Sequence, residues 1–148
     1  MKLRRLTADD DLTAATYLLQ RFFAEEGFTT PPAVIAERVQ MLAGLDTCLL
    51  ITAESDDTVV GVATASMEFG IEFGWWAEMG DLYVLPDARG LGVAKLLVDG
   101  IEDWLRSRGV AGYQVTVTPD GEDHHGLRAY YRKLGFTGDG RLLLFKDL

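Results

Sequence analysis

This chain of 148 residues is short of cysteine and has no long apolar run. Its single cysteine, Cys48, excludes an internal disulfide framework and a structural zinc site built from cysteines. No apolar stretch approaches the length of a membrane span, and no apolar segment follows the basic residues after Met1 as in a signal peptide. We therefore expect a cytoplasmic protein with no membrane contact. The length favours a single domain over residues 1–148.

Positive charge is also scarce, because 14 Lys and Arg residues face 23 Asp and Glu residues and the net charge is −9. A nucleic-acid binder neutralises phosphates with a basic face, so this balance argues against a nucleic-acid partner. The same charge would attract a small cationic substrate. Hydrophobic residues make up 48% of the chain and charged residues 25%, which is ordinary for a globular protein.

Apolar periodicity divides the chain into strands and helices. We expect strands at 2–6, 47–53, 58–67, 76–84 and 113–118, with the last strands at 136 and 142–145. Helices are expected from the N-cap Thr7 to near Gly27, from 30–32 to Gly44, from 93 to Gly109 and across 127–134, with 119–123 as a loop. The order β-α-α-β-β-β-α-β-α-β-β predicts an α/β fold, a mixed twisted sheet with helices on both faces.

Two segments allow a functional and a structural interpretation. Asp9, Asp10 and Asp11 fit the first turn of a helix, where the dipole favours anions, better than a metal site. The segment 68–76 carries four aromatics, two glycines and two glutamates in an expected connection. Loops often carry function, so this segment is either a satellite core or a substrate wall.

The stretch from Asp81 to Leu97 indicates an anion site. Alternating apolar residues form a strand, Pro86 ends it, and a turn with Gly90 and Gly92 leads into the helix at 93. The first N–H groups of a helix have no internal partner, and glycines let a phosphate come close to the backbone. A P-loop is excluded because no Lys-Ser/Thr pair follows the second glycine. The dinucleotide fingerprint is excluded because it needs a third glycine.

What remains, Arg89-x-x-Gly92-x-Ala94, resembles the acetyl-CoA pyrophosphate loop of the Gcn5-related N-acetyltransferases. About forty residues later, Tyr131-x-Lys133-x-Gly135-Phe136 resembles a second motif of that family, with the same separation. The expected order of elements also matches the family fold over essentially the whole chain. The resemblance thus implies the family's fold, in which two neighbouring strands splay apart.

The second motif departs from the family at two positions. The family often has an Asn seven residues before the tyrosine and an Ala four before it, where this chain has His124 and Leu127. That Asn usually helps hold the pantetheine arm, so His124 or the adjacent His125 is a candidate replacement. A metal site is not expected, because adjacent residues diverge around a helix and no third ligand is evident.

The resemblance implies that acetyl-CoA is the donor and that its acetyl group passes directly to an amine. The pyrophosphate would lie on the backbone of the loop. An open strand edge would pair with the pantetheine amides, as an added peptide strand does. A backbone N–H near Leu82 or Tyr83 would meet the developing oxyanion. The expected coenzyme-binding residues are Leu82, Tyr83, Val84, Arg89, Gly90, Leu91, Gly92, Val93, Ala94 and His124.

Two proton transfers need residues. By resemblance, Tyr131 would protonate the leaving thiolate. Glu78 lies four residues before Leu82, on the same face by strand parity, and is the candidate base that deprotonates the amine. Glu72 and Asp81 are alternative candidates for the base. A further alternative is that the Glu78 carboxylate only binds the substrate ammonium and takes no proton from it. A covalent route through Cys48 is not expected, since no base is in evident reach.

The sequence therefore predicts an acetyl-CoA-dependent N-acetyltransferase acting on a primary amine. The acidic balance favours a small cationic acceptor, such as a polyamine or an aminoglycoside. The alternatives are a protein lysine or N-terminal acetyltransferase, and an acyl-CoA-binding sensor without turnover. A homodimer is plausible for the family, although no sequence pattern identifies an interface.

Overall fold

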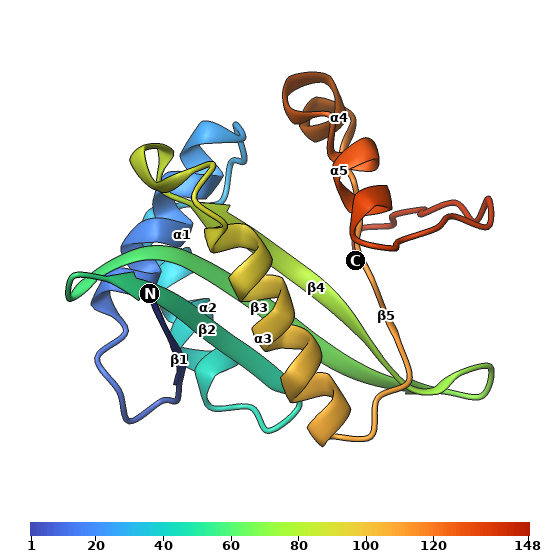
Figure 1. Ribbon diagram of the computed structural model, residues 1–148. Helices are drawn as coiled ribbons and strands as arrows, with labels where there is room; N and C mark the ends of the chain where they lie inside the picture. The colour runs from blue at the N-terminus through green and yellow to red at the C-terminus, as the bar shows by residue number, and fades with distance from the viewer. The chain divides into compact units, whose positions relative to one another are not determined.

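The computed structural model describes residues 1–148, which form two compact units, Met1–Val115 and Thr116–Leu148 (Figure 1). The first unit contains a five-stranded sheet in the order β1-β2-β3-β4-β5. Its elements are β1 (Lys2–Leu6), α1 (Thr13–Glu25), α2 (Pro32–Ala43), β2 (Cys48–Ser55), β3 (Thr58–Gly70), β4 (Gly74–Val84), the 3-10 turn η1 (Pro86–Ala88), α3 (Val93–Ser107) and β5 (Tyr113–Gln114). β1 to β4 pair antiparallel and β5 pairs parallel to β4, so the predicted mixed sheet is confirmed.

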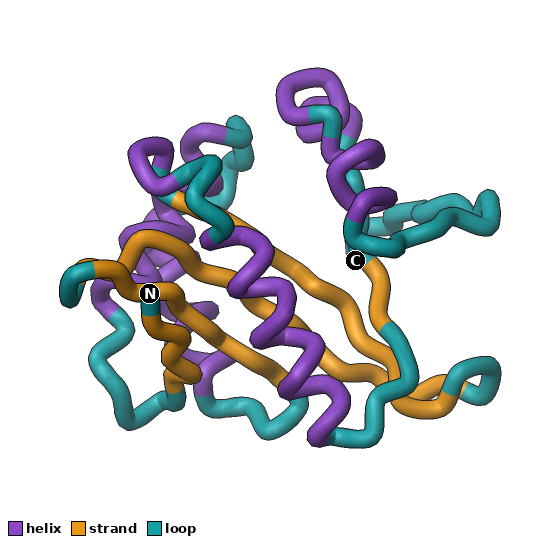
Figure 2. Tube along the Cα trace, in the orientation of Figure 1, coloured by secondary structure: helices purple, strands orange, loops and turns teal.

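Helices cover both faces of the sheet, as predicted. α3 crosses the face seen in Figure 2, and α1 and α2 lie on the other. Leu97 and Ile101 of α3 are fully buried, and a Cβ at Gly61 of β3 would meet Leu97 at 3.0 Å, so α3 packs closely on the strands. On the opposite face Tyr83 of β4 packs against Phe22 of α1. No helix combines the length and the apolar character that crossing a membrane requires.

A bulge at Gly80 changes the side-chain parity of β4. Thr64 pairs with Asp81 while Ala65 pairs with Met79, so β4 has one extra residue at this point. Glu78 pairs with Ser66, two residues from Thr64, and so lies on the face of Thr64 and Asp81 that α1 and α2 cover. The expectation that Glu78 shares a face with Leu82 is therefore wrong, because it assumed a strand without a bulge.

β4 and β5 separate almost as soon as they meet. Their parallel pairing consists of Ala77 with Tyr113 and Glu78 with Gln114. The strand expected over 113–118 is thus two residues long, and β4 beyond Glu78 has no neighbour on that side in the sheet. This is the splayed strand pair that the resemblance implied.

Two expectations near the turns are wrong. α1 begins at Thr13 and not after Thr7, because the Asp10 carboxylate accepts hydrogen bonds from the Thr7 backbone and hydroxyl and closes a separate turn. The aromatic segment 68–76 is mostly strand, since β3 runs to Gly70 and β4 begins at Gly74. A cross-strand pair of aromatic residues lies in the extended hairpin, with the rings of Phe69 and Trp75 5.3 Å apart.

The second unit contains α4 (Pro119–His125) and α5 (Leu127–Lys133). The expected helix across 127–134 is confirmed, but the expected loop at 119–123 is helical, because Pro119 starts the turn and the Thr118 hydroxyl accepts from the Gly121 backbone. The strands expected at 136 and 142–145 do not form. A strand needs a paired neighbour, and the side chains of Leu142, Leu144 and Phe145 are exposed.

Candidate active site

The turn before α3 has the shape of an anion cradle. Gly90 and Gly92 adopt positive φ of 78° and 83°, and a Cβ added to either would meet nothing within 4 Å. The first-turn N–H groups of α3 follow directly and have no intrahelical acceptor. The exposed Leu91 and the half-buried Ala94 leave the turn open, while Val93 is buried under the helix. The loop therefore fits a phosphate group approaching its backbone.

Arg89 is held by the fold itself. Its Nε donates to the Val84 carbonyl at 2.9 Å and its Nη2 pairs with Glu25 at 3.1 Å. Its guanidinium also lies 5.5 Å from the ring centroid of Tyr83. The side chain thus anchors the loop to β4 and to the end of α1.

Sequence reasoning missed Glu25, which joins the loop to the sheet. Its carboxylate accepts from the Tyr83 hydroxyl at 2.6 Å and from Arg89. These partners hold the pKa of Glu25 below its usual range, the Tyr83 hydrogen bond being the largest cause. Burial and the Glu25 hydrogen bond raise the pKa of Tyr83 to about 12. Tyr83 lies 58 residues away in the chain, so no local pattern marks this contact.

The free edge of β4 can be assigned residue by residue. The Leu85 N–H donates to the Val60 carbonyl, so in an antiparallel pair Leu85, Tyr83 and Asp81 direct their backbone groups toward β3. Leu82 and Val84 direct theirs to the opposite side, which β5 has already left. The Val84 carbonyl is taken by Arg89, whereas the N–H of Leu82 faces the open edge. Of the two expected oxyanion donors, only Leu82 has the required direction.

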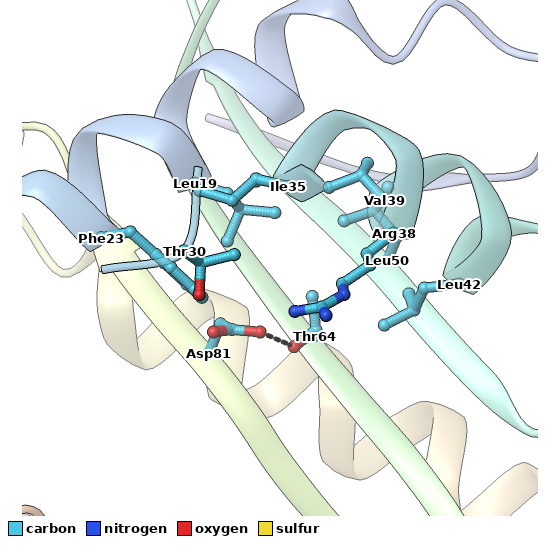
Figure 3. A pocket seen from close by; sticks show the side chains of 10 residues that line it. All are labelled: Leu19, Phe23, Thr30, Ile35, Arg38, Val39, Leu42, Leu50, Thr64 and Asp81. Carbon is cyan, nitrogen blue, oxygen red and sulfur yellow. Dashed lines mark hydrogen bonds between the residues drawn. The ribbon is translucent and has the colours of Figure 1, made fainter. Parts of the chain in front are cut away.

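A cavity of about 170 Å³ lies between α1, α2 and the sheet. Its lining is Leu19, Phe23, Thr30, Ile35, Arg38, Val39, Leu42, Leu50, Thr64 and Asp81 (Figure 3). The walls are mostly apolar, and the floor is the polar pair Thr64 and Asp81 from neighbouring strands. The cavity therefore opens the covered face of β4 to a ligand with an apolar body.

Asp81 is half-buried, and its carboxyl has one hydrogen-bonding partner. The Thr64 hydroxyl donates to its Oδ2 at 2.5 Å. Burial raises the pKa of Asp81, and the nearby Glu78 carboxylate raises it further, against the effect of the Thr64 hydrogen bond. Sequence reasoning named Asp81 as an alternative base, and the structure brings it together with Glu78 on one face. Glu78 is half-buried and lies next to the point where β5 departs.

Tyr131 and His124 belong to the second unit. Tyr131 of α5 makes edge-on ring contacts with Tyr130 and Phe136, and burial raises the pKa of its phenol to about 12. The Nδ1 atom of His124, in α4, lies 2.9 Å from the Asp120 carbonyl, and the His124 and His125 rings are 6.3 Å apart. Their coenzyme and proton-transfer roles stay predictions.

Comparison with known proteins gives a family and a set of similar folds. Residues 12–136 match the family model described as acetyltransferase (GNAT) family. No curated protein matches the chain. Among solved structures, an aminoglycoside acetyltransferase from an uncultured soil metagenomic sample, in complex with sisomicin, is 19% identical with a TM-score of 0.78, over 99% of this chain and 95% of that chain.

Two further structures have the same fold. The aminoglycoside N-acetyltransferase AAC(6')-Iy, with the bisubstrate analogue CoA-S-monomethyl-acetylneamine, is 18% identical with a TM-score of 0.83, over 99% of this chain and 97% of that chain. A ribosomal-protein-alanine N-acetyltransferase from Brucella melitensis biovar Abortus 2308 is 20% identical with a TM-score of 0.79, over 99% of this chain and all of that chain (100%).

Proposed function

Because the chain belongs to the Gcn5-related N-acetyltransferase (GNAT) family, whose donor is acetyl-CoA, we propose that it acetylates the primary amine of a small acceptor that binds as its ammonium ion. The observation that carries this proposal is on β4. Leu82 offers an N–H at the free edge, while the adjacent Asp81 faces the cavity on the covered face. Acetyl-CoA bound at the edge and an amine bound in the cavity would thus contact two consecutive residues of β4 and lie close to each other.

On the donor side, the open cradle at Gly90 and Gly92 would hold the pyrophosphate through backbone N–H groups. The unpaired edge of β4 would align the pantetheine amides as an added strand. The N–H of Leu82 would stabilise the oxyanion as the thioester carbonyl becomes tetrahedral. Each contact comes from the backbone, so the site depends on the shape of the loop more than on its side chains.

On the acceptor side, an ammonium must lose a proton before it attacks. Glu78 and Asp81 share the face that carries the cavity; Asp81 lines the cavity itself, while Glu78 lies where β5 departs. We assign deprotonation to Glu78, with Asp81 binding the ammonium. A phenol that keeps its proton at neutral pH has that proton available for the departing thiolate, which is the role assigned to Tyr131.

The acceptor class is supported by size and charge. A cavity of about 170 Å³ with a carboxyl at its floor suits one ammonium-bearing group. Two of the structural relatives are described as aminoglycoside acetyltransferases, which favours an acceptor that is not a protein. A second candidate is acetylation of a protein N-terminus, which the similarity to a ribosomal-protein-alanine N-acetyltransferase favours.

The test is release of free thiol from acetyl-CoA in the presence of a panel of amines and N-terminal peptides. We expect thiol release with small primary amines and little with peptides. Release with peptides alone would replace the proposal by the second candidate. Binding of coenzyme A in calorimetry, with no thiol release for any acceptor, would indicate a sensor module and overturn the proposal.

A further inference from the structure

The cavity between α1, α2 and the sheet carries opposite charges on two of its walls. Asp81 of β4 lies at the floor, and Arg38 of α2 extends its guanidinium into the same space, toward Thr64 (Figure 3). The two side chains form no ion pair within 4.0 Å. Each side chain can therefore form an ion pair with an oppositely charged group of a ligand placed between them.

Arg38 is unusual among the arginines of this side of the molecule. Arg21 and Arg89 pair with Glu25, and Arg4 pairs with Asp10. Arg38 makes no ion pair and no hydrogen bond, although it lines the cavity. A guanidinium with all its donors open is suited to a planar anion such as a carboxylate, which it can bind through two parallel hydrogen bonds.

Apart from Thr30 and Thr64, the rest of the lining is apolar and limits the size of the ligand. Aliphatic and aromatic side chains from three elements enclose the space: Leu19, Phe23, Ile35, Val39, Leu42 and Leu50. A dry cavity of about 150 Å³ elsewhere is large enough to bind benzene. A space of about 170 Å³ thus takes a short branched or aromatic hydrocarbon group and not a disaccharide.

We infer that the acceptor is an amino acid, or a similarly small compound, that carries one primary amine and one carboxylate on an apolar frame. Its ammonium would lie toward Asp81, its carboxylate would bind Arg38, and its apolar part would fill the cavity. The inference rests on the proposed function and narrows its acceptor. A polyamine fits this site less well, because its second ammonium would face the guanidinium of Arg38.

The experiment compares acceptors that differ only at the carboxylate. L-Leucine, L-leucinamide, 3-methylbutylamine (leucine without its carboxylate) and spermidine are assayed by thiol release from acetyl-CoA. They are assayed with the wild type, Arg38→Gln and the control Arg106→Gln. Arg106 lies on α3, on the other face of the sheet, and its loss changes the net charge equally. We expect the wild type to prefer leucine.

Arg38→Gln should lower kcat/KM for leucine by about 10- to 100-fold, mainly through KM, since a hydrogen bond to a charged group is lost. The same variant should have an unchanged or higher kcat/KM for 3-methylbutylamine. Arg106→Gln should change neither. A preference for spermidine, or an equal effect of Arg38→Gln on leucine and 3-methylbutylamine, would overturn the inference.

Binding is measured separately, so that failure of turnover is distinguished from failure of the site. Leucine at millimolar concentration should raise the Tm of the wild type and of Arg106→Gln but not of Arg38→Gln. A shift that depends on Arg38, without thiol release, would support the site and refute the transferase proposal. Absence of any leucine-dependent shift would refute the site.

Discussion

The hydroxyl of Tyr83 in β4 donates to the carboxylate of Glu25 at the end of α1, with an oxygen–oxygen distance of 2.6 Å. The same carboxylate pairs with Arg89, the first residue of the glycine turn. The turn that would hold a pyrophosphate is therefore fixed to the strand that would align the pantetheine arm. The fixing group is thus a residue at the end of α1, outside both the turn and the strand.

Replacing Glu25 by Gln should loosen this connection. The variant loses the charge that pairs with Arg89 but can still accept from Tyr83. We expect a loss of about 1 kcal/mol in the free energy of unfolding, the scale of one partly exposed charged hydrogen bond. We also expect weaker binding of coenzyme A. Urea denaturation and calorimetry measure the two effects, and Arg21→Gln, which removes only the other ion pair of Glu25, is the control. Unchanged binding of coenzyme A by Glu25→Gln would show that Glu25 does not support the coenzyme-binding conformation of the loop.

Substituting Gly92 by Ala should weaken coenzyme A binding about tenfold, because a Cβ would project into the space left for the phosphate. The matched control is Gly27→Ala. Gly27 has φ of 72° and, like Gly92, has nothing within 4 Å of an added Cβ. Both variants should lose about 1–2 kcal/mol of stability from the left-handed backbone. Equal coenzyme A affinity in the two variants would contradict the cradle.

Asp81→Asn should change stability and activity in opposite directions. Burial raises the pKa of Asp81, so the native state binds its proton more tightly than the unfolded chain does. The contribution of this group to stability is present at low pH and is lost as pH rises from about 4 through the native pKa. The Asn variant, which can still accept from Thr64, should thus be more stable than the wild type at neutral pH. The advantage should disappear in acid.

Turnover of the same Asp81→Asn variant should fall, because the ammonium loses its buried partner, and KM for the amine should rise by about 10- to 100-fold. Urea denaturation at two pH values and steady-state kinetics give both readouts. Glu78→Gln is the comparison and should lower kcat more than it raises KM. The reverse pattern would exchange the two assigned roles.

Tyr131→Phe should lower kcat while barely changing the affinity for acetyl-CoA, because only the hydroxyl is removed. Tyr130→Phe is the control, since the two rings lie in contact 5.4 Å apart and the substitution is identical. Rapid-mixing or steady-state thiol release and calorimetry check the prediction. Equal turnover in the two variants would remove Tyr131 from the role of proton donor.

Local chemistry explains what could be predicted from the sequence. α3 was predicted because Val93, Leu97 and Ile101 recur at helical spacing, and the turn before it because Gly90 and Gly92 adopt backbone angles that other residues avoid. These features depend on neighbouring residues in the chain, and so they can be recognised from the sequence without knowledge of the tertiary structure. The coenzyme-binding and proton-transfer roles of the named residues stay predictions.

What the sequence did not reveal depends on distant partners. The contact of Glu25 with Tyr83 joins two elements, and the strands expected after Gly135 needed a sheet edge to pair with. The bulge at Gly80 did leave a signal, since an isolated glycine inside a strand pattern often marks one. Regular alternation was assumed instead, and Glu78 was assigned to the wrong face.

The extra residue at Gly80 has a consequence for how the protein can change in evolution and design. Deleting it would leave Glu78 and Asp81 two residues apart in a regular strand, so both carboxyls would stay on the covered face with their pairings to β3 unchanged. Straightening the bulge with Gly80 retained would instead turn either Glu78 or Asp81 to the other face and split the pair. The register of one strand, rather than the identity of any acid, would then decide whether both carboxyls face the same amine.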